Sequence, residues 1–181
     1  MPHFCTSIIL FEKIAMQILD DRQIRQKIKR LAIEILERNF GQPEIILAGL
    51  NNNGVGFAEL LMQELSPILP NDMGITITRI QLNPANPLEY EPYIEMPEEL
   101  LRGKNIIIVD DVANTGRTIF YAVQPLLKVL PAKVEVAVLV DRKHKSFPIK
   151  ADYVGLSLYT TLKDHIVVKI RNVETMSVSL T

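Results

Sequence analysis

The sequence predicts an α/β protein with an open, mainly parallel, twisted β-sheet flanked by helices. The first observation is the run Ile106–Val109, whose branched aliphatic residues show no polar alternation. Such a run is typical of a strand that helices cover on both faces. The second observation is that segments with helical spacing separate the candidate strands, which is the pattern of a parallel sheet.

Length and composition favour one domain with a sizeable core. The chain has 181 residues, 48% of them hydrophobic, and a formal net charge of −1. This near-neutral balance argues against nucleic-acid binding by bulk charge, although it does not exclude binding through a local basic patch. The single cysteine, Cys5, excludes an internal disulfide and indicates a reducing, cytoplasmic compartment. No apolar run reaches the roughly 20 residues that cross a bilayer, so no membrane partner is expected.

The domain is expected to span residues 17–181, with residues 1–16 as an N-terminal extension or an edge strand. Ser7–Phe11 is the candidate edge strand. Alternatively, Met16 is the true start of the protein. The stretch lacks a basic segment before its apolar part, so it does not resemble a signal peptide.

A helix is predicted from Asp20 or Asp21, either of which can cap it. One face carries regularly spaced apolar residues: Ile24, Ile28, Leu31, Ala32 and Ile35. Gly41 and Pro43 are expected to end this helix. Arg22, Arg25 and Lys29 fall on the other side, which is either a solvated face or a nucleic-acid contact.

The first central strand is expected to begin at Ile45–Leu47, with a loop over Gly49–Gly54 and a helix continuing through Leu65. Loops that follow parallel strands meet at one edge of the sheet, so this loop could form an anion site. Its central residues are Leu50, Asn51, Asn52, Asn53 and Gly54. Alternatively, asparagine and glycine are present here only because they favour turns.

A further strand is predicted over Gly74–Leu82, where apolar and polar residues alternate. The Pro- and Glu-rich connection Asn83–Pro97 follows it. Long connections of this kind are often mobile lids. The stretch between Gln81 and Leu101 contains no cation.

The strand Ile106–Val109 is followed by two carboxylates, Asp110 and Asp111, and then by a short loop. A helix is expected from Arg117 to about Leu130, with a kink at Pro125. Unpaired backbone N–H groups at a helix start bind a phosphate, whereas paired acids suit a diol or a hydrated cation. A ligand with a ribose diol beside a phosphate satisfies both requirements. Alternatively, the acids only cap the next turn.

The stretch IIIVDDVANTGRT resembles the phosphoribosyl-pyrophosphate (PRPP) signature of type I phosphoribosyltransferases. The resemblance implies that Asp110 and Asp111 hold the ribose hydroxyls and, directly or through water, Mg²⁺. The loop that wraps the 5′-phosphate would then consist of Ala113, Asn114, Thr115, Gly116, Arg117 and Thr118. The segment Leu50–Gly54 would be the pyrophosphate loop, and Asn83–Pro97 the lid.

The segments QIRQKIKRLAIEILERN and DRKHKSFPIKADYVGLSLYTTLKDHIVVKI resemble one branch of this family. That branch comprises bifunctional pyrimidine-operon attenuation regulators with uracil phosphoribosyltransferase activity. The resemblance implies a small C-terminal hood at about residues 141–165. It also implies base contacts from Arg142, Lys143, Tyr153 and Val154. Considered without the resemblance, Tyr153 is a core aromatic residue.

The implied reaction joins PRPP to a pyrimidine such as uracil and yields a nucleoside monophosphate and pyrophosphate. Because the pyrophosphate loop and the lid lack basic residues, turnover is expected to be feeble or supported by Arg142, Lys143, a neighbouring subunit or extra metal. The alternative is a nucleotide-sensing RNA-binding regulator with weak or no transferase activity. A silent relative that binds a nucleotide and a protein partner is a third reading. The family also implies a homodimer or higher homo-oligomer.

Overall fold

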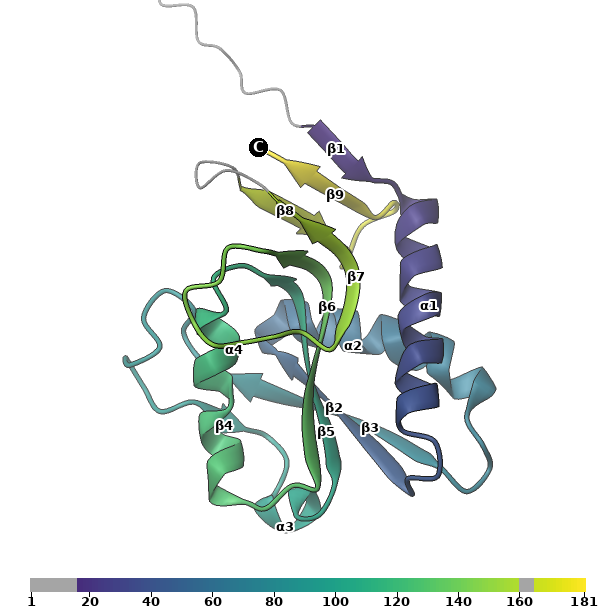
Figure 1. Ribbon diagram of the computed structural model, residues 1–181, viewed down its shortest axis with the longest axis vertical. Helices are drawn as coiled ribbons and strands as arrows, with labels where there is room; N and C mark the ends of the chain where they lie inside the picture. The colour runs from purple at the N-terminus through teal and green to yellow at the C-terminus, as the bar shows by residue number, and fades with distance from the viewer. Residues whose placement is uncertain (1–15, 160–164) are drawn as a thin grey trace, which may run out of the picture.

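A computed structural model describes residues 16–159 and 165–181 of the chain. Its main sheet has six strands in the order β4-β3-β2-β5-β6-β7, and every neighbouring pair is parallel except β3 with β4 (Figure 1). The predicted open, mainly parallel sheet is therefore confirmed. The strands in this order are β4 Tyr93–Ile94, β3 Gly74–Gln81, β2 Glu44–Leu50, β5 Asn105–Ala113, β6 Lys133–Arg142 and β7 Tyr153–Leu158.

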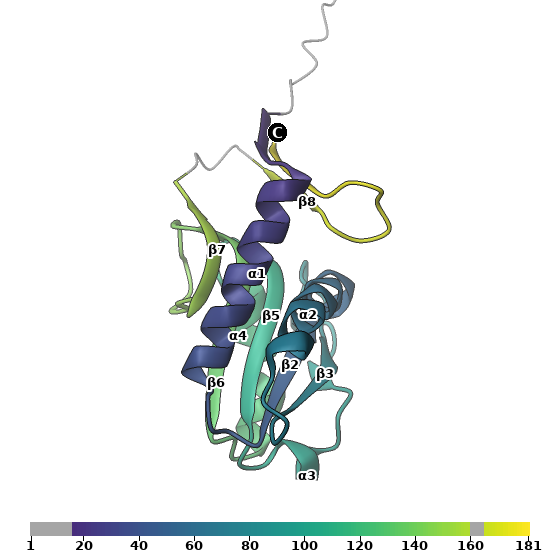
Figure 2. The ribbon, with the colours of Figure 1, turned by 90° about the vertical axis from the view of Figure 1, so that its right-hand side faces the viewer.

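Helices cover both faces of this sheet (Figures 1 and 2). One face carries α1 Asp21–Arg38 and α2 Asn51–Leu65, which the short 3-10 helix Ser66–Ile68 extends. The other face carries α3 Glu98–Leu101, α4 Arg117–Ala122 and the 3-10 helix η2 Gln124–Lys128. Each face therefore has its own apolar cluster, and the central strands are buried between the two, as their unbroken aliphatic runs predicted.

Helix α1 begins as the sequence predicted. The Asp20 carboxylate accepts from the backbone amide of Gln23, and the Gln23 side-chain oxygen accepts from the backbone amide of Asp20. This reciprocal pair is a capping box. The five predicted apolar residues of this helix are all buried. The helix ends at Arg38, before the predicted breakers, because the backbone of Asn39 leaves the helical conformation and its side chain donates to the carbonyl oxygen of Ile35 at 2.9 Å.

A second, antiparallel sheet of three strands lies beside the start of α1 (Figure 1). Its order is β1 Met16–Leu19, β9 Ser177–Leu180 and β8 Ile166–Lys169. The hood expected at about residues 141–165 is corrected, because β7 pairs in parallel with β6 and so completes the main sheet. The small sheet instead joins the two ends of the described chain. The candidate edge strand at residues 7–11 lies outside the described residues.

Several predicted boundaries move at the carboxyl ends of the strands. β5 continues through both acids to Ala113, and β6 continues to Arg142. The reason is that the two strands stay paired up to their last partners, Ala113 on β5 and Asp141 on β6. Helix α4 ends at Ala122 and Pro125 lies in η2, which confirms the predicted break. Within the ranges described, no helix is both long and apolar enough to span a membrane.

The strand order creates a switch point between β2 and β5. From β2 the chain continues to β3 on one side, and β5 lies on the other side of β2. Their following helices, α2 and α4, cover opposite faces of the sheet. In open α/β sheets the crevice outside the strand ends at such a point is where ligands bind.

Candidate active site

A cavity of about 580 Å³ opens at the switch point, over the carboxyl ends of β2, β3 and β5. It brings together the acid pair and the asparagine segment, which lie about sixty residues apart in the chain. The connection that follows β3 forms the remaining wall. The lining residues are Leu50, Asn51, Asn52, Asn53, Gln81, Leu82, Asn83, Pro84, Tyr90, Asp110, Asp111 and Thr118.

The two acids are half-buried and hydrogen-bonded mainly to backbone. Asp110 accepts from the amide of Asp111 at 3.0 Å, and Asp111 accepts from the amide of Val112 at 2.9 Å. Loss of solvent, reinforced by the charge of Asp111, raises the pKa of Asp110 well above its ordinary value. Burial also raises the pKa of Asp111, although the bonds that it accepts oppose the shift. The pair therefore favours a neighbouring cation, which would offset the cost of two adjacent negative charges.

The asparagine segment is the first turn of α2, and the predicted loop is thereby corrected. β2 runs through Leu50 and α2 begins at Asn51 without a connection. The turn is this tight because Gly54 has no side chain: an added Cβ would lie 2.2 Å from the carbonyl oxygen of Val109. As a result Asn53 reaches the acid pair, and its Nδ2 donates to Asp111 Oδ2 at 3.1 Å.

A smaller cavity of about 40 Å³ adjoins the first and contains the residues predicted to wrap a phosphate. Gly116 has a φ of +85°, a left-handed conformation that other residues rarely adopt. Within the described ranges, the amides of Thr115 and Gly116 donate to no backbone acceptor. These donors are therefore available to an anion. The lining consists of Asp110, Val112, Ala113, Asn114, Thr115, Gly116, Arg117, Thr118 and Ile119.

The predicted lid segment is attached to the signature helix. Arg117 Nη2 donates to the carbonyl oxygen of Pro84 at 2.8 Å, and Lys128 pairs with Glu91 at 2.6 Å. The lid segment contains no lysine or arginine. Both cations that contact it, Arg117 and Lys128, belong to α4 and η2. The side chain of Arg117 therefore bonds to the lid segment, while the residue itself helps to line the smaller cavity.

Arg142 and Lys143, which were predicted to contact the base, lie at the carboxyl end of β6 as expected. Neither residue lines the two cavities described above. Arg142 is buried and its Nη1 donates to Asn114 Oδ1 at 2.9 Å. Lys143 pairs with Asp141 at 2.8 Å. Burial alone would raise the pKa of Asp141, but Lys143 and Lys145 bond to it and lower its pKa below the ordinary value.

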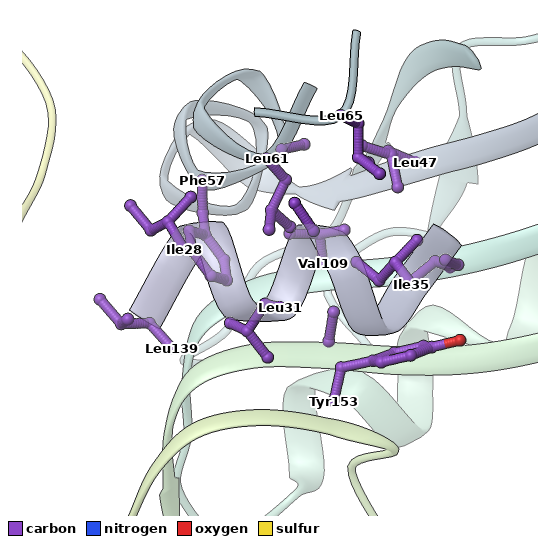
Figure 3. Close-up of a cluster of buried hydrophobic side chains, with 14 of the residues drawn as sticks. Ile28, Leu31, Ile35, Leu47, Phe57, Leu61, Leu65, Val109, Leu139 and Tyr153 are labelled. Carbon is purple, nitrogen blue, oxygen red and sulfur yellow. The ribbon is translucent and has the colours of Figure 1, made fainter. Parts of the chain in front are cut away.

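Tyr153 does not border a ligand cavity, and the prediction that its ring stacks on a base is wrong. Its side chain is 0% exposed and packs in the cluster beneath α1 (Figure 3). Its hydroxyl donates to Glu135 Oε2 at 2.9 Å and accepts from Asn39 at 3.0 Å. Val154 points to the opposite face, half-buried against the second cluster. Both lie near the start of β7, whereas the cavities open at the other end of the sheet.

Two cations at the end of β8, Lys169 and Arg171, share a cavity with Asp111 and were not predicted from the sequence. A cavity of about 150 Å³ is lined by Asn53 and Asp111 on one side and by residues of the β8 end, Val168, Lys169, Ile170, Arg171 and Val173, on the other. Arg171 lies against α2, since an added Cβ at Gly56 would come within 2.2 Å of its Cδ. No local motif marks these residues, because they reach the acids only through tertiary packing.

Together, the fold and the two adjoining cavities define an open α/β protein with a carboxylate pair and a loop of unpaired amides side by side at the switch point. The family model described as "Phosphoribosyl transferase domain" matches residues 15–171. The chain therefore belongs to the phosphoribosyltransferase family, and the relatives it matches place it on the PyrR branch.

These relatives carry the name "Bifunctional protein PyrR". The protein of Bacillus pumilus is 34% identical over 166 residues, which cover 87% of this chain and 91% of the relative. That of Halalkalibacterium halodurans is 36% identical over 166 residues, with the same shares covered. A crystal structure of a hypoxanthine-guanine phosphoribosyltransferase from Bacillus anthracis matches with a TM-score of 0.70 at 22% identity, covering 90% of this chain and 96% of that one. This last likeness shows the fold.

The raised pKa of Asp110 predicts a pH-dependent stability. A carboxyl group that binds its proton more tightly when folded lowers the free energy of unfolding as pH rises from its ordinary pKa of 3.8 through its folded-state pKa. We therefore expect Asp110→Asn to be more stable than the wild type at neutral pH. The difference should shrink as pH falls from the raised folded-state pKa towards 3.8, and it should no longer change below 3.8. Urea unfolding across this pH range, in EDTA and without nucleotide, measures it.

Asp72→Asn is the matched control, because Asp72 is exposed in a turn. A variant at position 110 that is less stable than the wild type at neutral pH would contradict the electrostatic account. So would a stability difference that does not change with pH.

Proposed function

We propose that the adjoining cavities bind PRPP with Mg²⁺ and transfer its phosphoribosyl group to a pyrimidine such as uracil, releasing pyrophosphate. The observation that carries the proposal is that Asp110 and Thr118 line both the main cavity and the smaller one. One ligand can therefore place a ribose over the acids and its 5′-phosphate in the smaller cavity. The family supports the class of reaction, and the PyrR relatives support the choice of base.

In this arrangement each part of the substrate has its own residues. Asp110 and Asp111 accept hydrogen bonds from the ribose hydroxyls, because ionised carboxylates are acceptors only. Amides and hydroxyls of residues 113–118 donate to the 5′-phosphate. Amide groups of Asn51, Asn52 and Asn53 face the space left for the diphosphate.

Mg²⁺ fits the acid pair. Protein sites for this ion use one or two carboxylates and keep water or substrate phosphate as the other ligands. Burial and the charge of Asp111 raise the pKa of Asp110, and a bound cation would offset both effects. When bound, the ion neutralises the diphosphate as it leaves. Asp110 and Asp111, held by backbone bonds, orient the sugar so that its anomeric carbon faces the base.

Lys169 and Arg171 compensate for the absence of cations in the asparagine segment. Their cavity shares Asn53 and Asp111 with the main cavity, so both cations lie beside the space assigned to the diphosphate. Among the described residues, no ion pair occupies either side chain. Positive charge beside the diphosphate would stabilise the negative charge that develops as it leaves.

The remaining features are expectations from the sequence and the family. Arg142 and Lys143 stay candidates for the base or pyrophosphate end, through the loop that they border. A homodimer or higher homo-oligomer is expected from the family. A cytoplasmic location stays a prediction from the single cysteine.

Transfer assays test the reaction and the base. With saturating Mg²⁺ and PRPP, we expect uridine monophosphate to form at least about tenfold faster than the products from hypoxanthine, guanine or xanthine, because a purine carries a fused second ring and attacks through a nitrogen of that ring. Replacement of both acids by asparagine should lower the rate by about a hundredfold or more. A preference for a purine would refute the base assignment. Failure to bind PRPP would refute the reaction itself.

Arg171→Gln tests the source of the missing positive charge. We expect kcat/KM for PRPP to fall by about tenfold or more, because a charged donor to the diphosphate is lost. Arg102→Gln is the control, since Arg102 is exposed just before β5, at the opposite end of the sheet. Equal kcat/KM values for both variants and the wild type would assign Arg171 no part in the reaction.

RNA binding is the alternative function, and the basic side of α1 favours it. Arg22, Lys29 and Arg30 are exposed on this helix. If this face binds a pyrimidine-operon leader transcript, a gel shift should appear at low salt and weaken steeply as salt rises. Absence of a shift at low salt, with and without uridine monophosphate, would exclude this function for the chain.

A further inference from the structure

Three consecutive carbonyl groups of the phosphate loop are bonded to one neighbouring segment, residues 145–147. Lys145 Nζ donates to the carbonyl oxygens of Ala113 at 2.9 Å and Asn114 at 3.0 Å. The amides of Ser146 and Phe147 donate to the carbonyl oxygen of Thr115 at 3.0 and 3.2 Å. The first half of the loop, residues 113–115, is therefore held on its outer side.

This attachment determines where the amides of the loop point. In a planar trans peptide the N–H points away from the preceding C=O. Carbonyls held toward residues 145–147 therefore turn the amides of Asn114, Thr115 and Gly116 to the opposite side. All three residues line the small cavity assigned to the 5′-phosphate.

Lys145 is placed to control this orientation. Its Nζ also donates to the carbonyl oxygen of Arg142 at 2.7 Å and to Asp141 Oδ1 at 2.5 Å. Four acceptors thus surround one ammonium group, which has three N–H donors. The side chain is 19% exposed, so these contacts are largely shielded from water.

Two residues that flank this segment, Arg142 and Ile149, also support the loop. Arg142 Nη1 holds the side chain of Asn114 at 2.9 Å. Ile149 packs beneath Gly116, where an added Cβ would lie 3.2 Å from the Cβ of Ile149. Lys143 contacts Asp141 without bonding to any loop carbonyl, so among the lysines described here Lys145 alone holds the loop backbone.

We propose that Lys145 is a positioning residue for the phosphate of the substrate. It does not touch the phosphate; it bonds to the outer carbonyls so that the amides of residues 114–116 are preorganised toward the cavity. The inference rests on the proposed function, because it takes the small cavity as the site of the 5′-phosphate.

The test compares Lys145→Met and Lys145→Gln with the wild type. Lys150→Met is the matched control, because Lys150 is an exposed lysine only five residues further along the chain. Titration calorimetry with ribose 5-phosphate and with PRPP measures binding, and thermal melts establish that each variant is folded. Steady-state kinetics with uracil separate the two KM values from kcat.

For Lys145→Met we expect the Kd of ribose 5-phosphate to rise by about tenfold, equivalent to about 1.4 kcal/mol. KM for PRPP should rise similarly, while KM for uracil and kcat should change by less than about threefold. Lys145→Gln should show a smaller loss in the same direction, since its amide still donates hydrogen bonds. Lys150→Met should match the wild type.

Wild-type affinity for ribose 5-phosphate in a folded Lys145 variant would overturn the inference. So would equal increases in both KM values, which indicate a general structural defect. If Lys145→Met is unfolded, the glutamine variant decides by the same criteria. Failure of the wild type to bind either ribose 5-phosphate or PRPP would instead overturn the proposed function, and the inference with it.

Discussion

The close approach of helix α2 to strand β5 is the constraint on which the site depends. The first turn of α2 fits against β5 because Gly54 places only hydrogen atoms near the carbonyl oxygen of Val109. Gly49 gives the same freedom on the β2 side, where an added Cβ would lie 2.4 Å from the amide nitrogen of Val55. With this contact Asn53 meets Asp111; a connecting loop would separate the asparagines from the acids.

Charge within the site is arranged around an acid pair that is short of cations. The pKa of both acids is raised by burial, and no lysine or arginine pairs with either among the described residues. Positive charge lies at the margins, in Lys169 and Arg171 of the small sheet and in Lys145 behind the phosphate loop. Such a centre favours a ligand that brings its own cation, as PRPP does with Mg²⁺.

The two ends of the main sheet are used differently. The amino end holds a buried network in which Asn39 bonds to Asn105 at 3.0 Å and to Tyr153 at 3.0 Å. Hydrogen bonding makes the burial of these polar groups tolerable. The carboxyl end is hollow, and its backbone donors face cavities. Tyr153 belongs to the filled end, which is why an aromatic ring that resembles a base contact in the sequence is a core residue in the fold.

Four features could be predicted from the sequence alone: the parallel sheet, the buried face of α1, the acid pair and the loop after it. These features are local: unbroken aliphatic runs, helical spacing and a contiguous motif require no knowledge of distant residues. The folded structure was needed to see that Asn51–Asn53 begin a helix, that Tyr153 lies in the core, that Lys145 bonds to the loop, and that Arg171 shares a cavity with Asp111. Each of these depends on contacts between segments that are distant in the chain: Gly54 with Val109, Tyr153 with Asn39, Lys145 with Ala113, and Arg171 with Gly56. Local sequence patterns cannot express such contacts, because the residues that make them are brought together only when the sheet is assembled.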